Sequence, residues 1–316
     1  MRVAITGAGG RLGRSLVAAL EEAPFTGPFG PLAWSRPDYD LDDPAAAARL
    51  VRRDAPEVVV HAAAWTDVDG CAREPELAMR RNAMAVAELA DACVTTGADL
   101  VVVSTNEVFD GRRTDGRGYA ADDRPGPGNP YGASKLAGET AAQAAFLRRE
   151  GFLATEPGGA PPGGPQLAIV RTAWLFGPPG NDFPARILAA AERARAAAEP
   201  LRVVGDEVGS PTYAPDLAEA IVELLAAGAC AGIHHIVNGG AVSRAGWARA
   251  VLEAARVEVP VEEVPLAAWV RPSAVPAWAV LAPTPLPSGE PLRPWQAAFA
   301  DYLPHLLRDH SAGARR

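Results

Sequence analysis

Residues 3–13 read Val3-Ala4-Ile5-Thr6-Gly7-Ala8-Gly9-Gly10-Arg11-Leu12-Gly13, a short apolar run followed by a glycine-rich loop and the start of an amphipathic pattern. This order of strand, loop and helix is the context in which a glycine motif binds a dinucleotide. Gly7 permits a tight turn, Gly10 lets the backbone approach a pyrophosphate, and Gly13 lets the helix pack closely on the strand. The stretch predicts a Rossmann-like fold, with Arg11 and Leu12 at a helix N-terminus that faces the phosphates.

The first half of the chain repeats this alternation of strand and helix. Ala-rich amphipathic stretches follow apolar runs that predict buried strands at 3–6, 32–35, 58–61 and 100–104. A long helix is expected from 130 to about 150, and a further strand at 167–172. This rhythm is typical of an α/β fold with a doubly wound parallel sheet.

The second half is less regular and predicts a smaller lobe. A chain of 316 residues exceeds what one core usually supports. Helices are expected near 183–195, 215–227, 244–256 and 295–307, with short strands at 201–204 and 232–237. The many prolines of 272–294 exclude a long regular element there.

These patterns predict two domains. We expect residues 1–172, rejoined by about 213–240, to form the dinucleotide-binding domain. Residues 173–212 and 241–316 are then a smaller C-terminal α+β substrate-binding lobe. The Gly- and Pro-rich segment 151–166 is expected to be a flexible surface loop, and the tail 311–316 to be frayed.

Composition excludes several classes of protein. With 48% hydrophobic and 22% charged residues the chain is an ordinary globular protein, and no apolar run approaches the roughly 18 residues of a membrane span. A strand that begins near residue 2 leaves no room for a signal peptide, so we expect a cytoplasmic protein. The net charge of −8, without a long basic block, argues against nucleic acid as a partner. The three cysteines lack a Cys-x-x-Cys pair and predict neither disulfides nor a metal site.

A single lysine marks the candidate catalytic helix. Lys135 is the only lysine among 30 basic residues, and it stands four residues after Tyr131, on one face of the predicted helix. Ser104 and Thr105 stand at the end of the preceding strand. When hydride reaches a carbonyl carbon, the developing oxyanion needs a proton and a hydrogen-bond donor. Tyr131 would supply the proton and Thr105 would hold the oxygen.

Lys135 would have two tasks at such a site. Its positive charge would lower the phenol pKa of Tyr131, and its ammonium group would bind the nicotinamide ribose, so Tyr131 and Lys135 are also cofactor-binding candidates. Arg is a poor substitute because a planar fork replaces a compact charge. The spacing alone also fits an unremarkable pair on a helix surface, and that alternative stays open.

The end of the second strand bears on the choice of cofactor. An acidic residue there binds the ribose 2′-hydroxyl, whereas Arg accommodates a 2′-phosphate. Ser35 and Arg36 therefore favour NADPH, while Asp38 and Asp40 close behind leave NADH open. Asp40 and Leu41 are expected beside the adenine. Further cofactor contacts are expected at Ala62, Ala63 and Ala64, although the Ala-rich composition of the chain explains this run equally well.

Taken together, the motifs resemble the dTDP-4-dehydrorhamnose reductase family of extended short-chain reductases, in which the glycine spacing is Gly-x-x-Gly-x-x-Gly. The resemblance covers most of residues 1–240, and the C-terminal quarter matches only loosely. The blocks that carry it after the glycine loop are His61-Ala62-Ala63-Ala64-Trp65-Thr66-Asp67-Val68-Asp69, Tyr131-Gly132-Ala133-Ser134-Lys135-Leu136-Ala137-Gly138-Glu139, Val170-Arg171-Thr172-Ala173-Trp174-Leu175-Phe176-Gly177, Gly180-Asn181-Asp182-Phe183 and Val208-Gly209-Ser210-Pro211-Thr212-Tyr213-Ala214.

The resemblance implies reduction of the 4-keto group of a dTDP-4-keto-6-deoxy sugar with NAD(P)H, which completes dTDP-L-rhamnose, and a possible homodimer. Thr105, Tyr131 and Lys135 would be catalytic. The resemblance implies that the sugar is bordered by Thr66, Val68, Thr105, Asn106, Glu107, Trp174 and Asn181. Trp174 fits a core aromatic equally well.

The chain departs from the family at one motif. The usual Ser-Thr-Asp-Tyr-Val-Phe-Asp-Gly is here Ser-Thr-Asn-Glu-Val-Phe-Asp-Gly, with Asn106 and Glu107. Related 4,6-dehydratases carry Thr-Asp-Glu, with Asp as acid and Glu as base. Because an amide cannot donate a proton in this way, Asn106 disfavours dehydration. Glu107 is open to three roles: a sugar contact that changes the accepted keto sugar, a base in an epimerising step, or a solvated loop residue.

Other functions stay open at this point. Another nucleotide-sugar 4-ketoreductase would use the same residues. A UDP- or GDP-sugar epimerase would use them with a tightly kept NAD. A non-catalytic, NADP-binding regulatory subunit is the alternative from a different class.

Overall fold

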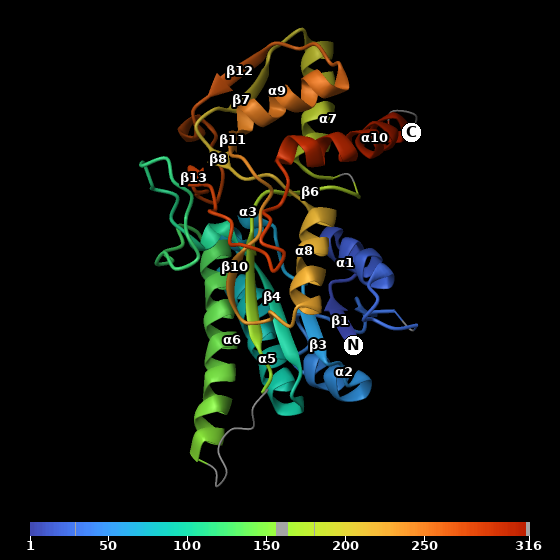
Figure 1. Ribbon diagram of the computed structural model, residues 1–316. Helices are drawn as coiled ribbons and strands as arrows, with labels where there is room; N and C mark the ends of the chain where they lie inside the picture. The colour runs from blue at the N-terminus through green and yellow to red at the C-terminus, as the bar shows by residue number, and fades with distance from the viewer. Residues whose placement is uncertain (29, 156–163, 180, 314–316) are drawn as a thin grey trace.

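Six parallel strands form the central sheet of the computed structural model, which describes residues 1–28, 30–155, 164–179 and 181–313 (Figure 1). The strand order is β10-β5-β4-β3-β1-β2. The chain therefore winds to both sides of the border between β1 and β3, where a crevice opens at the carboxyl ends of the strands. The strands are β1 (Val3–Thr6), β2 (Leu32–Trp34), β3 (Val58–His61), β4 (Asp99–Thr105), β5 (Leu167–Thr172) and β10 (Gly232–His235). The predicted doubly wound sheet is confirmed.

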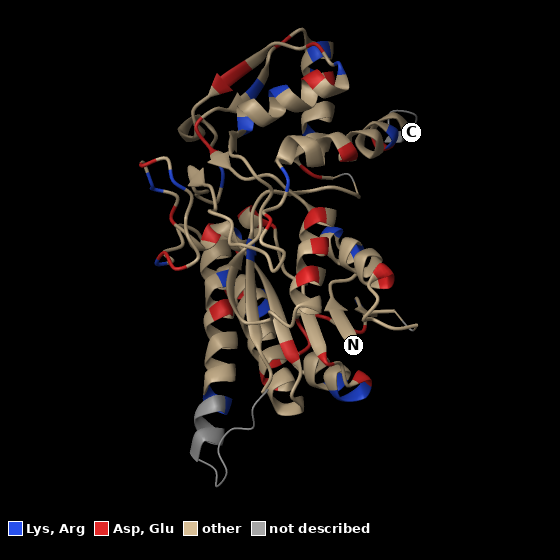
Figure 2. Cartoon of the chain, in the orientation of Figure 1, with Lys and Arg blue, Asp and Glu red and all other residues tan. Residues whose placement is uncertain are grey.

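Helices cover both faces of this sheet, which is why its strands are apolar on both sides. The helices α1 (Arg11–Glu22) and α8 (Ala214–Ala226) pack on the face to which β1 directs Val3 and Ile5. The opposite face packs, through Ala4, against α2 (Ala46–Asp54), α5 (Ala85–Thr96) and α6 (Pro130–Thr155). Charged residues lie along the helices, and the strands between them carry few (Figure 2).

Short elements connect β3 to α5 and follow β4. After β3 come α3 (Val68–Arg73), α4 (Pro75–Met79) and a π-helical turn, Arg80–Met84. A 3₁₀ turn, Asn106–Val108, follows β4 directly. Within the described part of the chain, no helix is both long and apolar enough to span a bilayer.

The remaining elements gather beyond the carboxyl ends of the central strands (Figure 1). The helices α7 (Phe183–Ala197), α9 (Arg244–Ala255) and α10 (Trp295–Gly313) share an aromatic core around Phe176, Trp247 and Tyr302. Three small sheets complete this region: β7 (Leu201–Val204) with β12 (Val261–Val264), β6 (Leu175–Phe176) with β9 (Thr212–Tyr213), and β11 (Val242–Ser243), β8 (Val208–Gly209) and β13 (Trp278–Ala279). A 3₁₀ turn spans Leu266–Ala268.

Two predictions about irregular segments were partly wrong. Residues 151–155, predicted as part of a loop, belong to α6, because helix propagation continues until the first proline, Pro157, approaches. The rest of that predicted loop falls largely on 156–163, outside the described residues. Residues 311–313, predicted to be frayed, belong to α10, whose last turns are held to α7 by a 2.7 Å contact between His310 Nε2 and Glu192 Oε1.

Two strands also end earlier than predicted. The strand β2 ends at Trp34 because the backbone turns at Ser35, whose carbonyl accepts a hydrogen bond from Tyr39 N at 3.0 Å. The strand β10 ends at His235, although Ile236 N still donates to Arg171 O at 3.0 Å and both Ile236 and Val237 are buried.

A buried ion pair joins the sheet to α6. Arg171 of β5 and Glu139 of α6 are each 2% exposed, with Arg171 Nη2 donating to Glu139 Oε2 at 2.7 Å. Ser104 of β4 also donates to Glu139, and Arg171 Nη1 lies 3.5 Å from His235 Nε2 of β10. Glu139 thus connects β4 and β5 to the helix, and Arg171 extends the network to β10. Breaking such a pair leaves an unpaired charge in a low-dielectric interior.

We therefore predict that Arg171→Met lowers the free energy of unfolding by about 3–5 kcal/mol, because it leaves Glu139 buried and unpaired. The double variant Arg171→Met/Glu139→Gln should lose less than the single variant. The matched control is Arg148→Met, since the Arg148–Asp91 pair is 66% and 64% exposed, and it should cost under about 1 kcal/mol. Urea unfolding measures all three, and equal losses for Arg171→Met and Arg148→Met would contradict the prediction.

Candidate active site

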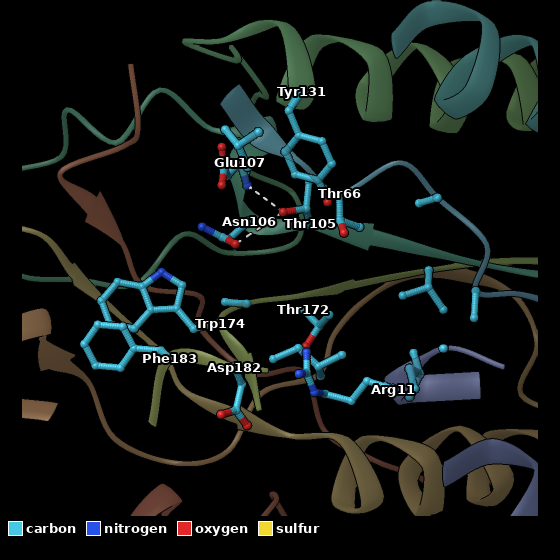
Figure 3. A pocket seen from close by; sticks show the side chains of 18 of the residues that line it. Arg11, Thr66, Thr105, Asn106, Glu107, Tyr131, Thr172, Trp174, Asp182 and Phe183 are labelled. Atoms are coloured by element: carbon cyan, nitrogen blue, oxygen red, sulfur yellow. Dashed lines mark hydrogen bonds between the residues drawn. The ribbon is translucent and has the colours of Figure 1, made fainter. Parts of the chain in front are cut away.

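A cavity of about 620 Å³ opens at the carboxyl ends of the central strands and extends into the C-terminal region. Figure 3 shows Tyr131, Thr105, Asn106 and Glu107 on one side of it and Trp174, Phe183 and Asp182 across from them. Arg11 and Thr172 lie toward the glycine loop. The predicted catalytic and sugar-bordering residues all line this cavity: Thr66, Val68, Thr105, Asn106, Glu107, Tyr131, Lys135, Trp174 and Asn181.

The glycine loop has the shape that a pyrophosphate needs. Gly7 has φ +67°, and a Cβ there would lie 2.8 Å from Ala63 Cα. A Cβ at Gly13 would lie 2.1 Å from the Gly7 carbonyl oxygen, so only glycine lets α1 pack this closely. Gly10 caps α1 without a side-chain hydrogen bond, so no side chain competes with an anion for the first amides of the helix. Gly7, Gly10, Arg11, Leu12 and Gly13 all line the cavity.

A second cavity, of about 520 Å³, shares Gly7, Gly9 and Gly10 with the first and extends to the end of β2 at Ser35. Gly9 N donates to Ser35 Oγ at 3.2 Å, which joins the loop to the end of β2. Two arginines line this cavity. Arg81 contacts Asp42 at 2.6 Å, whereas Arg36 makes no ion pair among the described residues. The other predicted cofactor residues line it too: Asp40, Leu41, Ala62, Ala63 and Ala64.

Tyr131 is held in place by the start of α6. Asn129 Oδ1 accepts a hydrogen bond from Gly132 N at 2.8 Å and so caps the helix just ahead of Tyr131. Tyr131 is 8% exposed, and its burial raises the pKa of the phenol, as does the nearby Glu107 carboxylate. A hydrogen bond with Thr105 acts in the opposite direction. The phenol therefore stays protonated at neutral pH, as a proton donor must.

Lys135 lies one turn further along α6 and is 4% exposed. Its Nζ donates to the Val103 carbonyl oxygen at 2.7 Å. Burial lowers the pKa of Lys135 to about 8, and the Glu139 carboxylate opposes that shift. The expected lowering of the Tyr131 pKa is not observed: burial of the phenol dominates, and the ammonium is directed to the Val103 carbonyl.

Trp174 lies between the cavity and the aromatic core, and its contact with the sugar stays a prediction. Its indole lines the cavity and also stacks on Trp247 of the aromatic core, with ring centroids 5.8 Å apart. The Arg244 guanidinium lies 3.5 Å from the indole centroid, a cation–π contact. Trp174 has φ +42°, a left-handed conformation that costs a bulky residue on the order of 1–3 kcal/mol and persists only when packing fixes it.

Hydrogen bonds of Arg11 and of Asn82 hold segments that border the cavity. Arg11 Nε donates to the Gly177 carbonyl at 2.9 Å and Arg11 Nη2 to Asn181 Oδ1 at 2.5 Å, so α1 is tied to the segment before α7. The loop that carries Thr66 and Val68 is fixed by Asn82, whose Oδ1 accepts from Trp65 N at 2.8 Å.

Sequence reasoning missed the arginines of a third cavity. This cavity, of about 690 Å³, shares Thr66, Val68, Glu107 and Phe183 with the first. Its basic lining residues are Arg186, Arg193, Arg202, Arg244 and Arg271. They lie on α7, β7, α9 and a loop. Single arginines at such positions form no recognisable sequence motif. Phe183, in a block that the resemblance included, was the one available signal.

Comparisons with known proteins agree on one family. The profile described as "RmlD substrate binding domain" matches residues 1–308. A dTDP-4-dehydrorhamnose reductase of Mycobacterium tuberculosis is 39% identical over 309 residues, which cover 96% of this chain and 92% of that protein.

Solved structures show the same likeness. A crystal structure of a dTDP-4-dehydrorhamnose reductase from Clostridium acetobutylicum superposes with a TM-score of 0.84 at 28% identity, covering 97% of this chain and all of that one. One from Bacillus anthracis, in complex with NADP, has a TM-score of 0.81 at 28% identity and covers 96% of this chain and 99% of that one.

The pKa of Lys135 generates a prediction for the pH dependence of ketone reduction at this site. If the charged ammonium is required, kcat is at its maximum below about pH 8 and falls about tenfold per pH unit above it, because the proton leaves Lys135 there. Tyr131 contributes no fall in this range because its pKa is raised.

The variant Lys135→Arg tests whether deprotonation of Lys135 causes the fall of kcat above about pH 8. The guanidinium stays charged throughout the range but cannot occupy the place of a compact ammonium, so the rate should be much lower and should not fall between pH 7 and 9.5. A wild-type profile that is flat to pH 9.5, or a variant profile with the same fall, would show that Lys135 is not the titrating group.

Proposed function

This chain belongs to the RmlD substrate-binding-domain family, and we propose that it reduces the 4-keto group of dTDP-4-dehydrorhamnose with NADPH to give dTDP-L-rhamnose. The observation that carries the proposal is the meeting of Thr105, Tyr131 and Lys135 in one cavity that begins at a dinucleotide-binding loop. Several relatives that share this chain's length, among them that of Mycobacterium tuberculosis, are dTDP-4-dehydrorhamnose reductases, and the structure of one such reductase contains NADP.

The residues around the glycine loop fit a dinucleotide. Gly7 and Gly13 let the loop pack closely on Ala63 and on the start of α1, where a Cβ would meet backbone, and we assign the 2′-phosphate to Arg36, which lines the second cavity. Bound NADPH supplies the hydride for the carbonyl carbon. Ser35 and Arg36 support NADPH over NADH.

The protein groups stabilise and protonate the oxygen. The Thr105 hydroxyl, 7% exposed, holds the substrate oxygen as negative charge develops on it. The Tyr131 phenol, protonated because burial raises its pKa, gives that oxygen a proton. Lys135, one turn further along α6, supplies the positive charge that we assign to the nicotinamide ribose.

The third cavity supports a nucleotide sugar as the substrate. A diphosphate needs cations, and this cavity is lined by five arginines together with four carboxylates, those of Asp67, Asp69, Glu107 and Glu207. Arg244 and Arg271 already contact Glu207 and Asp69, at 2.8 and 3.0 Å. Arg186 is the arginine shared by both cavities that makes no ion pair among the described residues, so we assign it to the diphosphate. On this assignment, residues 173–212 and 241–316 supply the nucleotide end of the site.

The experiment follows oxidation of NADPH and of NADH with dTDP-4-dehydrorhamnose and a panel of other 4-keto-6-deoxy sugars. We expect turnover with NADPH and dTDP-4-dehydrorhamnose. Tyr131→Phe should lower kcat at least 100-fold while the variant still binds NADPH, because only the proton donor is lost. The matched control is Tyr119→Phe, which removes a phenol that bonds Asp110 at 2.9 Å outside the three cavities and should keep the rate.

Three results would contradict the proposal in whole or in part. Wild-type turnover of Tyr131→Phe would exclude Tyr131 as the proton donor. Absence of NADPH oxidation with every keto sugar would favour a non-catalytic subunit, and preference for another sugar in the panel would reassign the substrate.

A further inference from the structure

Glu107 is a carboxylate in the active site that the reduction does not use. It lies two residues after Thr105, in the 3₁₀ turn that follows β4, and it lines both the catalytic cavity and the arginine-rich cavity. Its backbone N donates to Thr105 Oγ1 at 3.2 Å, so it is tied to the hydroxyl that we assign to the substrate oxygen. Its carboxylate shares the cavity with Thr105 and Tyr131 and is near enough to raise the pKa of the Tyr131 phenol (Figure 3).

Asn129 fixes the orientation of this carboxylate. Asn129 Nδ2 donates to Glu107 Oε2 at 2.7 Å and to the Ala274 carbonyl at 2.8 Å, while its Oδ1 caps α6 at Gly132 N. The amide therefore cannot turn away without losing the helix cap. The second oxygen, Glu107 Oε1, has no hydrogen-bond partner among the described residues. It is not one of the fully buried polar atoms that lack a partner, so it keeps some accessible surface. One oxygen of the carboxylate is thus anchored and the other is available.

The surroundings of Glu107 make it a stronger base than a surface carboxylate. Burial raises its pKa, and the nearby Glu207 carboxylate adds to that effect. The Asn129 hydrogen bond, Arg244 and Arg271 act in the opposite direction. Both arginines are already paired, with Glu207 and Asp69, which leaves Glu107 without an ion pair among the described residues.

We propose that Glu107 removes a proton from the carbon next to the ketone of the bound keto sugar, so that this protein exchanges that hydrogen with solvent in addition to reducing the ketone. The C–H bond breaks, the proton moves to Glu107 Oε1, and the electron pair forms a carbon–carbon double bond. The carbonyl π pair moves to oxygen, where Thr105 and Tyr131 hold the enolate. Return of a proton from Glu107, after exchange with water, regenerates the ketone without an oxidant or a reductant.

The inference rests on the proposed function, because it takes its ketone from that reaction and uses the same oxyanion contacts. The two reactions differ in what reaches the sugar. Reduction needs hydride at the carbonyl carbon, whereas exchange needs only the base beside the adjacent carbon. Omission of reduced cofactor therefore separates them.

The test incubates the protein with dTDP-4-dehydrorhamnose and NADP⁺ in D₂O and follows deuterium in the recovered keto sugar by mass spectrometry and NMR. Reduction is measured in parallel with NADPH. Wild-type protein should incorporate deuterium next to the ketone well above the rate in buffer alone. Glu107→Gln, which keeps the shape and the Asn129 contact, should lower the ratio of exchange to reduction about 100-fold, the usual contribution of a general base.

The control variant is Asp110→Asn. Asp110 is an exposed carboxylate three residues further along the same loop, bonded to Tyr119 and Arg112 outside the three cavities, and its loss should change neither rate. Reduction by wild type without exchange above buffer would overturn this inference alone. An unchanged ratio in Glu107→Gln would assign the base elsewhere and overturn it too. Absence of reduction as well as exchange would overturn the proposed function.

Discussion

The buried ammonium of Lys135 is the charge on which the position of α6 depends. Lys135 is 4% exposed, and its positive charge is compensated by the Val103 carbonyl and by the field of Glu139. A buried charge is tolerated only with such partners. Glu139 is in turn held by Arg171 and Ser104. The catalytic helix is therefore fixed to β4 and β5 through charge, and Tyr131 is fixed with it.

Most of the sheet and half of the site were predictable because they depend on local sequence. The run Val3–Gly13 specifies a strand, a turn and a helix by itself, and the lone lysine at i+4 from Tyr131 indicates one helix face. The two-residue strands β6, β8, β9, β11 and β13 were not predicted, because so short a strand has no periodicity and forms only by tertiary pairing. The pKa of Tyr131 depends on burial, which a motif does not report.

One wall of the site comes from segments with recognisable sequence motifs, and the opposite wall comes from the aromatic core of the C-terminal region. The central sheet brings the glycine loop, Thr105 and α6 together, whereas Trp174 and Arg244 come from the aromatic core opposite. The strained backbone of Trp174 is held by its stacking on Trp247 and by its contact with Arg244, which fix the indole on this wall of the cavity. Glu107 stands where these walls meet, which is where a departure from the family can change chemistry without changing the fold.

The central claim is that hydride from NADPH arrives at the carbonyl carbon in the cavity of Thr105, Tyr131 and Lys135. Its most direct test is turnover of dTDP-4-dehydrorhamnose with NADPH deuterated at both C4 positions of the nicotinamide, in ordinary water. The account predicts dTDP-L-rhamnose that carries one deuterium, at sugar C4. A reduced product with only solvent hydrogen at C4 would contradict it.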